Sequence, residues 1–503
     1  MNGPPRRPGP GAPARAPAAG PAPAPRRIGL ATKIGLLLGL LIMGKVASMA
    51  RRGPVGTEEL RLIGIVLGEI LLLIVALVNV NFVFYVLVFY LPFSQMLPGD
   101  YGTAVNITNV LVVIVVFGLF FRSIREGGHF LVSTELDRLI GLHLLLTFVA
   151  FFRAALAETM DWFLLVTLVK RFITPILLYY LASWIVRDRQ QIQDCIYIVM
   201  LTTLMVAFLA TKDTHTPTHF SWERREDAGL SQANLLAAFF VYYMFYYFAF
   251  FSLHANQCKY WLLLLCIYPC ARAIMLAFSR GGYFAFVAGT LYICWLHKKW
   301  LFAVTAVAML LLWQKPELVL PQAVVERIEG TTVESQVDYG ESEVRLESSS
   351  AGRVKIYTAG LKMVMHHPLL GVGYGQFPVR VGEYDAYAAG RDAHNAYLLI
   401  AAEMGIPALV VYMMIVFRLL RYSLAMYRYG ADTMYRAVGM GFATGVIGFL
   451  VVNFFGCRFN TTETVGVWWI LAAMIILIRR QSMMAPGAAP PPPGAVRPAG
   501  RTP

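Results

Sequence analysis

Long runs of apolar residues, separated by short polar or basic stretches, extend from about residue 60 to residue 480. Because about 20 apolar residues cross the hydrocarbon core of a bilayer as a helix, each run predicts a spanning helix. The twelve predicted spans are 62–91, 104–121, 138–152, 172–186, 191–210, 231–252, 259–278, 281–297, 300–313, 394–417, 437–456 and 464–478. At the start, residues 28–50 could span or lie in the interface, and 62–91 could be a hairpin that turns at Asn79-Val80-Asn81. The pattern predicts an all-α polytopic membrane protein.

Composition supports this fold class and excludes several functions. Of the 503 residues, 58% are hydrophobic and 14% are charged, against about 25% charged residues in soluble proteins. The six cysteines include no CxxC pair, so a zinc site, a redox motif and a disulfide framework are not expected.

The net charge of +14 lies largely in the amino-terminal tail and in short loops between apolar runs, which is a positive-inside pattern and not a nucleic-acid surface. This pattern places the tails 1–27 and 481–503 in the cytoplasm, and their Pro/Ala/Arg-rich composition predicts that both are disordered. Between them we expect amino-terminal spans over 28–313, a long periplasmic loop over 314–393 and carboxyl-terminal spans over 394–480. About 80 residues is long for a loop without structure, so short helices are expected in it.

The strongest local signal extends from Arg353 to Pro407. An amphipathic helix is predicted to end near His367-Pro368, and Gly371, Gly373 and Gly375 then permit a tight turn. His394 and Asn395 open the next span, where an imidazole at the water boundary could act as a general base. The alternative is a histidine that only caps or snorkels. A metal site made of His366, His367, Asp392 and His394 would match no standard spacing.

Three further positions place arginine on the same, external side. Arg280 stands between two predicted spans in Ser279-Arg280-Gly281, Arg224 and Arg225 lie in a loop before a helix that begins near Asn234, and Arg458 follows Gly456-Cys457. The guanidinium fork suits phosphate oxygens, whereas snorkelling to lipid headgroups is the alternative. Lys170-Arg171 predicts an interfacial bend.

The sequence resembles the O-antigen ligase and O-antigen polymerase superfamily of bacterial membrane glycosyltransferases. The resemblance rests on Arg353, His367-Pro368, Gly371-Val372-Gly373, His394-Asn395 and Glu403-Met404-Gly405-Ile406-Pro407, with Ser279-Arg280-Gly281 and Gly229 to Asn234 as further landmarks. Tyr357 stands where many members have tryptophan.

The resemblance implies a GT-C-like architecture in the bacterial inner membrane, with a periplasmic active face. It implies inverting transfer of a glycan from undecaprenyl diphosphate to a sugar hydroxyl, without metal, cofactor or nucleotide sugar. His394 would activate the acceptor, and Arg280, with Arg224 or Arg225, would hold the diphosphate. Arg353, Asn395, Gly371, Gly373 and Arg458 would support the site. The ligase, whose acceptor is lipid A core, is preferred over a polymerase, whose acceptor is a carrier-linked repeat unit. A transporter of the lipid-linked glycan is the rival class.

Overall fold

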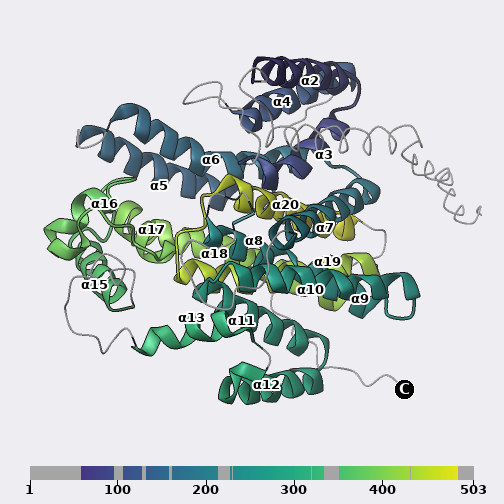
Figure 1. Cartoon of the computed structure of the whole chain (residues 1–503). Helices are drawn as coiled ribbons and strands as arrows, with labels where there is room; N and C mark the ends of the chain where they lie inside the picture. The colour runs from purple at the N-terminus through teal and green to yellow at the C-terminus, as the bar shows by residue number, and fades with distance from the viewer. Residues whose placement is uncertain are drawn as a thin grey trace, which may run out of the picture.

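The computed structural model describes residues 58–95, 106–126, 132–157, 161–212, 227–228, 230, 232–318, 320–333, 350–430 and 432–484. Every regular element in these residues is a helix (Figure 1). The predicted all-α polytopic fold is therefore confirmed. The predicted tail 1–27, residues 485–503 of the other predicted tail and the alternative for residues 28–50 lie outside the described residues. Residues 481–484, predicted to begin a disordered tail, belong instead to the last helix, Thr462–Met484.

The amino-terminal half forms the helices α2 (Glu58–Val78), α3 (Val80–Tyr90), η2 (Leu91–Phe93), α4 (Ile107–Glu126), α5 (Asp137–Leu156), α6 (Trp162–Ile185), α7 (Arg189–Thr211), α8 (Ala233–Tyr243), α9 (Phe245–Leu253), η4 (Cys258–Trp261) and α10 (Leu262–Leu276). The remainder forms α11 (Arg280–His297), α12 (Lys299–Gln314), η5 (Pro316–Leu318), α13 (Gln322–Val333), α15 (Ser350–His366), α16 (Phe377–Arg380), η6 (Val381–Glu383), η7 (Ala386–Ala388), α17 (Ala396–Met404), α18 (Ile406–Tyr429), α19 (Thr433–Phe454) and α20 (Thr462–Met484). Short helices thus occupy the described part of 314–393.

Nine helices in the described part of the chain are long and apolar enough to cross a membrane, compared with twelve predicted spans. Neither α11 nor α12 is among the nine. The run 62–91 is divided at Asn79, whose side chain accepts a hydrogen bond from Phe82 N and caps α3. This break lies where the predicted hairpin would turn.

One further prediction needs correction, and another stays a prediction. Helix α6 is continuous from Trp162 to Ile185 and contains Pro175, so its continuity does not test the bend predicted at Lys170-Arg171. The predicted span 394–417 is divided at Gly405, which has a φ of +87° and separates α17 from α18. The spanning helix therefore begins at Ile406, and α17 precedes it.

The core lies where α8, α9, α19 and α20 pack in the middle of the bundle, whereas α2 and α12 lie at its edges (Figure 1). In Ala233–Leu253 and Thr462–Ser482, 83% of the apolar window is buried, but only 28% in Cys258–Leu276. Glycines let α19 approach α8 closely, since a methyl group on Gly445 would lie 2.5 Å from the carbonyl oxygen of Tyr242. The peripheral helices expose apolar side chains, as expected of lipid-facing surfaces.

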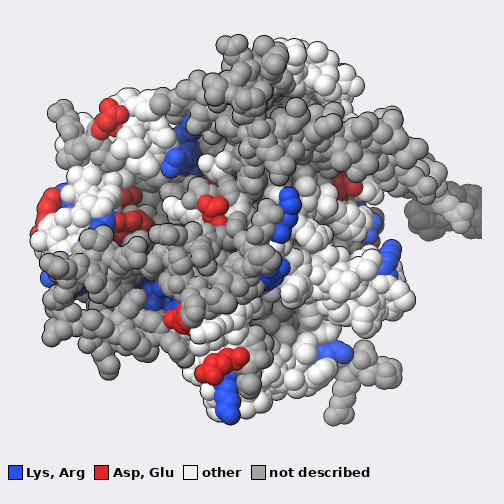
Figure 2. Space-filling view, viewed as in Figure 1, with Lys and Arg blue, Asp and Glu red and all other residues white. Residues whose placement is uncertain are grey.

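Connections between successive spans alternate between two ends of the bundle. One end, which we call the basic end, contains the α4–α5, α6–α7, α9–α10 and α18–α19 connections. There Arg187 pairs with Glu126 at 2.5 Å, and Arg189 with Asp432 at 2.6 Å. The opposite end, the loop end, contains α13 and α15–α17, and its surface in view has neighbouring acidic and basic side chains (Figure 2).

Candidate functional site

Helix α15 places Arg353 and Tyr357 one turn apart, so both lie on the same face. The Tyr357 hydroxyl lies 3.1 Å from the carbonyl oxygen of His394 and 3.5 Å from that of Phe454, and donates to these acceptors. Arg353 is close enough to act electrostatically on His394 and on Arg458. The amphipathic helix thus connects two chain segments that are far apart in the sequence.

His394 directly precedes the start of α17 in an unusual backbone conformation, with a φ of +49°. Its Nδ1 lies 3.8 Å from the Asp392 carboxylate, and 45% of its side chain is exposed. Asn395 caps α17, because its side-chain oxygen accepts from the backbone N–H groups of Tyr397 and Leu398. The cap fixes the start of the helix, and the imidazole stays accessible from outside.

The pKa of the His394 imidazole lies below the ordinary histidine value. Partial burial is the largest cause, and the charges of Arg353, Arg458 and Arg391 lower the pKa further, against the opposing effect of Asp392. A lowered pKa keeps the ring neutral, and able to accept a proton, at neutral pH.

Arg458 reaches the same place from the connection between α19 and α20. Its Nε donates to the carbonyl oxygen of Asn234 at 3.2 Å, and its backbone N–H donates to the Asn453 side chain at 2.9 Å. Burial lowers the pKa of Arg458, although a guanidinium stays protonated under physiological conditions. Arg458 therefore holds the start of α8 against the end of α19.

Arg280 is the first residue of α11, whose start is capped by Ser279 through a bond from Gly282 N to Ser279 Oγ of 3.3 Å. A methyl group on Gly281 would lie 2.7 Å from Cβ of Phe455. Phe455 directly follows Phe454, whose carbonyl oxygen accepts from Tyr357. The structure therefore brings Arg280, Arg353, His394 and Arg458 to the loop end, around the segment 454–458.

The glycine turn supports α17 and does not line the cluster. Gly371 and Gly373 have φ values of +65° and +117°. Val372 N donates to the carbonyl oxygen of Ala402 at 2.8 Å, and Gly373 N donates to that of Glu403 at 3.0 Å. A methyl group on Gly371 would lie 2.3 Å from the Glu403 carbonyl carbon, so the turn needs glycine for its conformation and for the close contact.

The sequence motif contained Glu403 without indicating its role. Its Oε1 accepts from Phe377 N at 3.0 Å, and its carboxyl is buried. Burial raises the pKa of Glu403 to about 7, against the lowering effect of the N–H groups of Gly375 and Phe377. The hydrophobic periodicity of the sequence could not identify this contact, because Glu403 and Phe377 lie 26 positions apart and meet only in the folded chain.

Backbone strain also surrounds the cluster. In the described part of the chain, the residues other than glycine with positive φ are Ala228 (+46°), Phe278 (+46°) and His394 (+49°). Each adjoins a predicted motif: Ala228 precedes α8, and Phe278 precedes Arg280 by two residues. Such conformations cost about 1–3 kcal/mol and concentrate at functional sites. No sequence signal indicated the strain at Ala228 or Phe278.

The described structure accounts for only part of the remaining predicted residues. Arg224 and Arg225 lie outside the described residues. His366 packs against Tyr384, with ring centroids 5.4 Å apart. The described residues contain no group of three or more histidine, cysteine or acidic side chains placed to hold a metal. A cavity of about 380 Å³ between α7, α9 and α10 is lined by none of these predicted site residues.

Residues 261–413 match the model of a protein family described as O-antigen ligase (Wzy_C). The match extends from the start of α10 into α18 and includes Arg280, Arg353 and His394. No curated protein matches the chain. The family match confirms the resemblance to the O-antigen ligase and polymerase superfamily.

Proposed function

We propose, from the match of residues 261–413 to the O-antigen ligase family, that the chain is a glycosyltransferase acting on undecaprenyl-diphosphate-linked glycans. The match supports a function in the membrane of the kind that the ligases and polymerases of this family have. As a ligase, it transfers the glycan to a sugar hydroxyl of lipid A core. The observation that carries the proposal is that His394, Arg353 and Arg458 lie together at the end of the bundle where Gly281, next to Arg280, packs against Phe455.

The reaction needs a base and a stabilised leaving group. Neutral His394 accepts the proton of the acceptor hydroxyl as its oxygen attacks the anomeric carbon from the face opposite the diphosphate. The bond from that carbon to the diphosphate oxygen breaks, and the anomeric centre inverts. The electron pair leaves with the carrier diphosphate. Because the leaving group is good, the protein mainly positions the reactants and stabilises the developing charge.

The arginines have separate roles in this proposal. Arg280, with Arg224 or Arg225, binds the diphosphate, since a guanidinium fork matches two phosphate oxygens. Arg353 and Arg458 supply positive charge beside His394 and keep the imidazole neutral. Asn395, Gly371 and Gly373 hold the chain around α17.

The distribution of charge supports a periplasmic site in the inner membrane. Arg122, Arg187, Arg189, Lys298 and Lys299 lie where spans meet at the basic end. The positive-inside tendency assigns that end to the cytoplasm. The loop end, with His394 and Arg280, then faces the periplasm, where a lipid-linked glycan and a lipid A core acceptor would meet.

The placement favours an enzyme over a transporter. Arg280 and His394 lie at the same end of the bundle, whereas transport sites occur near the bilayer midplane between repeated halves. A polymerase would use the same residues with a carrier-linked acceptor, so the acceptor distinguishes it from the ligase.

The test uses the purified chain in detergent with an undecaprenyl-diphosphate oligosaccharide and two separate acceptors, without added metal or nucleotide. Glycosylation of lipid A core supports the ligase, and lengthening of the carrier-linked chain supports the polymerase. If the lipid binds and neither acceptor is glycosylated, the proposed transferase is wrong and the transporter takes its place.

A further inference from the structure

A cavity of about 380 Å³ lies between α7, α9, η4 and α10, separate from the cluster around His394. Its volume is in the range of small-molecule sites, which is about 300–1,000 Å³. Lys259 lies in η4, directly before the start of α10, whereas Arg280 follows the end of α10. The 15 residues of α10 rise about 22 Å at 1.5 Å each, so the cavity mouth and Arg280 are at opposite ends of this helix.

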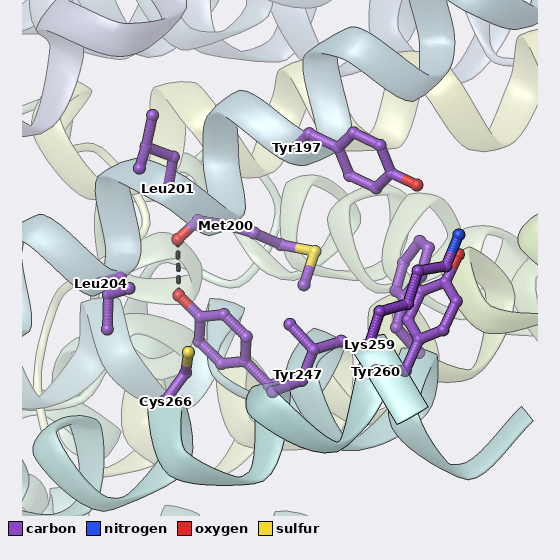
Figure 3. Close-up of a pocket in the computed structure, with 10 residues that line it drawn as sticks. Tyr197, Met200, Leu201, Leu204, Tyr247, Lys259, Tyr260 and Cys266 are labelled. Atoms are coloured by element: carbon purple, nitrogen blue, oxygen red, sulfur yellow. Dashed lines mark hydrogen bonds between the residues drawn. The ribbon is translucent and has the colours of Figure 1, made fainter. Parts of the chain in front are cut away.

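The cavity has a polar end with a charged group and a mainly apolar end, where the Tyr247 hydroxyl donates to the Met200 carbonyl oxygen (Figure 3). In Figure 3 the hydroxyl of Tyr197 points toward the neighbouring ends of Lys259 and Tyr260. Leu201, Leu204 and Cys266 lie at the opposite side of the cavity. An occupant that matches this arrangement has a polar head and an apolar tail.

The polar end carries positive charge without a carboxylate in the lining. Lys259 is the charged residue among the lining residues, and its Nζ lies 5.1 Å from the centre of the Tyr260 ring. The closest acidic residue along α7, Asp194, accepts from Gln190 at 2.9 Å and from Tyr85 at 3.4 Å. The head of the occupant should therefore be anionic.

The cavity opens toward the lipid-facing side of the bundle. On α10, Leu262 and Leu265 are 64% and 71% exposed, and Leu201 on α7 is 44% exposed. Lys259 lies at the basic end, which by the positive-inside rule contacts the cytoplasmic leaflet. That leaflet contains anionic phospholipids, and each lysine near its surface contributes roughly 1 kcal/mol of attraction.

We propose that this cavity between α7 and α10 binds one anionic phospholipid. The phosphate of the lipid contacts Lys259 and Tyr260, and one acyl chain lies between Leu201, Leu204 and Leu263. This lipid is not the glycan donor, because the cavity lies at the end of α10 opposite Arg280. The assignment is independent of the proposed transferase activity.

The test measures phospholipid binding to the purified full chain by native mass spectrometry. Phosphatidylglycerol and phosphatidylcholine with the same acyl chains are titrated separately. We expect the first phosphatidylglycerol to bind about five-fold more tightly. Lys259→Gln should remove this preference, whereas the matched control Lys298→Gln, an exposed lysine at the same end that does not line the cavity, should keep it. Equal affinity for the two lipids in the unsubstituted chain, or an unchanged preference in Lys259→Gln, would overturn the proposal.

A second variant tests the tail site without changing charge. Leu263→Trp should fill the cavity and weaken binding of both lipids, and Leu262→Trp, on the exposed surface, should not. Thermal midpoints in phosphatidylcholine verify that the variants remain folded. In a competition experiment, undecaprenyl phosphate is added at the same concentration as phosphatidylglycerol. If it displaces phosphatidylglycerol from the unsubstituted chain, the cavity binds the undecaprenyl carrier instead and the proposal is wrong.

Discussion

The Tyr357 hydroxyl donates a hydrogen bond to the carbonyl oxygen of His394, with an oxygen–oxygen distance of 3.1 Å. The carbonyl oxygen of Phe454 lies 3.5 Å from the same hydroxyl. Tyr357 thus positions the backbone of the proposed base, which has a strained φ of +49°, from a separate helix. The resemblance led us to expect tryptophan at this position, and tyrosine supplies the hydrogen-bond donor that either side chain could provide.

Replacement of Tyr357 by phenylalanine removes the donor and keeps the ring. A net hydrogen bond contributes about 0.5–1.5 kcal/mol, so we expect a loss of kcat of roughly 3- to 10-fold. Tyr357→Trp, which restores a donor, should recover most of the activity. The measurement is steady-state transfer to the preferred acceptor, with KM for the donor expected to change little. Full activity in Tyr357→Phe would show that this bond does not position His394.

His394→Ala removes the proposed base from the loop end. General-base catalysis contributes about 10²–10⁴-fold, so transfer should fall by that factor while membrane insertion and detergent extraction remain normal. The matched control is His366→Ala, because His366 packs on Tyr384 and does not join the cluster. Near-normal transfer by His394→Ala would exclude the imidazole as the base.

Charges around His394 should move the acidic limb of the pH profile in opposite directions. Arg353 lowers the pKa of His394, and Asp392 raises it. Because the neutral imidazole is the active form, kcat/KM falls as the pH drops through this pKa. Arg353→Gln should therefore shift the acidic limb to higher pH, and Asp392→Asn should shift it to lower pH.

The control for these pH profiles is Lys355→Gln, on the same helix as Arg353. Lys355 lies over the Tyr387 ring, with Nζ 5.0 Å from its centre, and is not among the charges with the largest effects on the pKa of His394. Its profile should match that of the unsubstituted chain. Shifts of Arg353→Gln and Asp392→Asn in the same direction would contradict the electrostatic account.

Arg280→Lys tests the proposed contact with the diphosphate. An ammonium keeps the charge but cannot form the paired, planar hydrogen bonds of a guanidinium. Because a hydrogen bond to a charged group contributes about 1.5–3 kcal/mol, we expect a loss of kcat/KM of roughly 10-fold or more, measured with the undecaprenyl-diphosphate donor. The control is Arg189→Lys at the basic end, where Arg189 pairs with Asp432 and no substrate contact is proposed. Equal activity of Arg280→Lys and the unsubstituted chain would remove Arg280 from the diphosphate site.

The sequence predicted the fold class well because apolar run length directly reflects bilayer thickness. It predicted helix breaks less well. Asn79 and Gly405 each divide a continuous apolar run, and hydropathy does not register a single capping residue or a positive φ.

The candidate site was predictable in its residue types and not in its internal contacts. Arg353, His394 and Arg458 are visible as motifs, and the structure brings them together. The bond from Arg458 to Asn234 joins residues that are 224 positions apart, and no local pattern encodes such a pair. Likewise, no feature of the surrounding sequence indicates the positive φ of Phe278, which packs against Ala323 and Val324 about 45 residues later.

Glu403→Gln should change how stability depends on pH. Burial raises the pKa of Glu403 from an ordinary value near 4.5 to about 7. Between these values the folded state binds more protons than the unfolded state, so stability falls as pH rises through this window and levels off above pH 7. At about 1.4 kcal/mol per pKa unit, the ionised carboxylate costs on the order of 3 kcal/mol. Glutamine keeps an oxygen that can accept from Phe377 N and has no charge to bury.

In detergent, the thermal midpoint of Glu403→Gln minus that of the unsubstituted chain should therefore increase as the pH rises from 4.5 to 7. Glu383→Gln is the control, because Glu383 forms an exposed pair with Arg380 at 3.1 Å and should not alter this trend. The variant should also retain transfer activity, since Glu403 supports the turn at Gly371–Phe377 and contacts no proposed substrate atom. Parallel stability curves for Glu403→Gln and the unsubstituted chain would mean that the carboxyl does not titrate within this window.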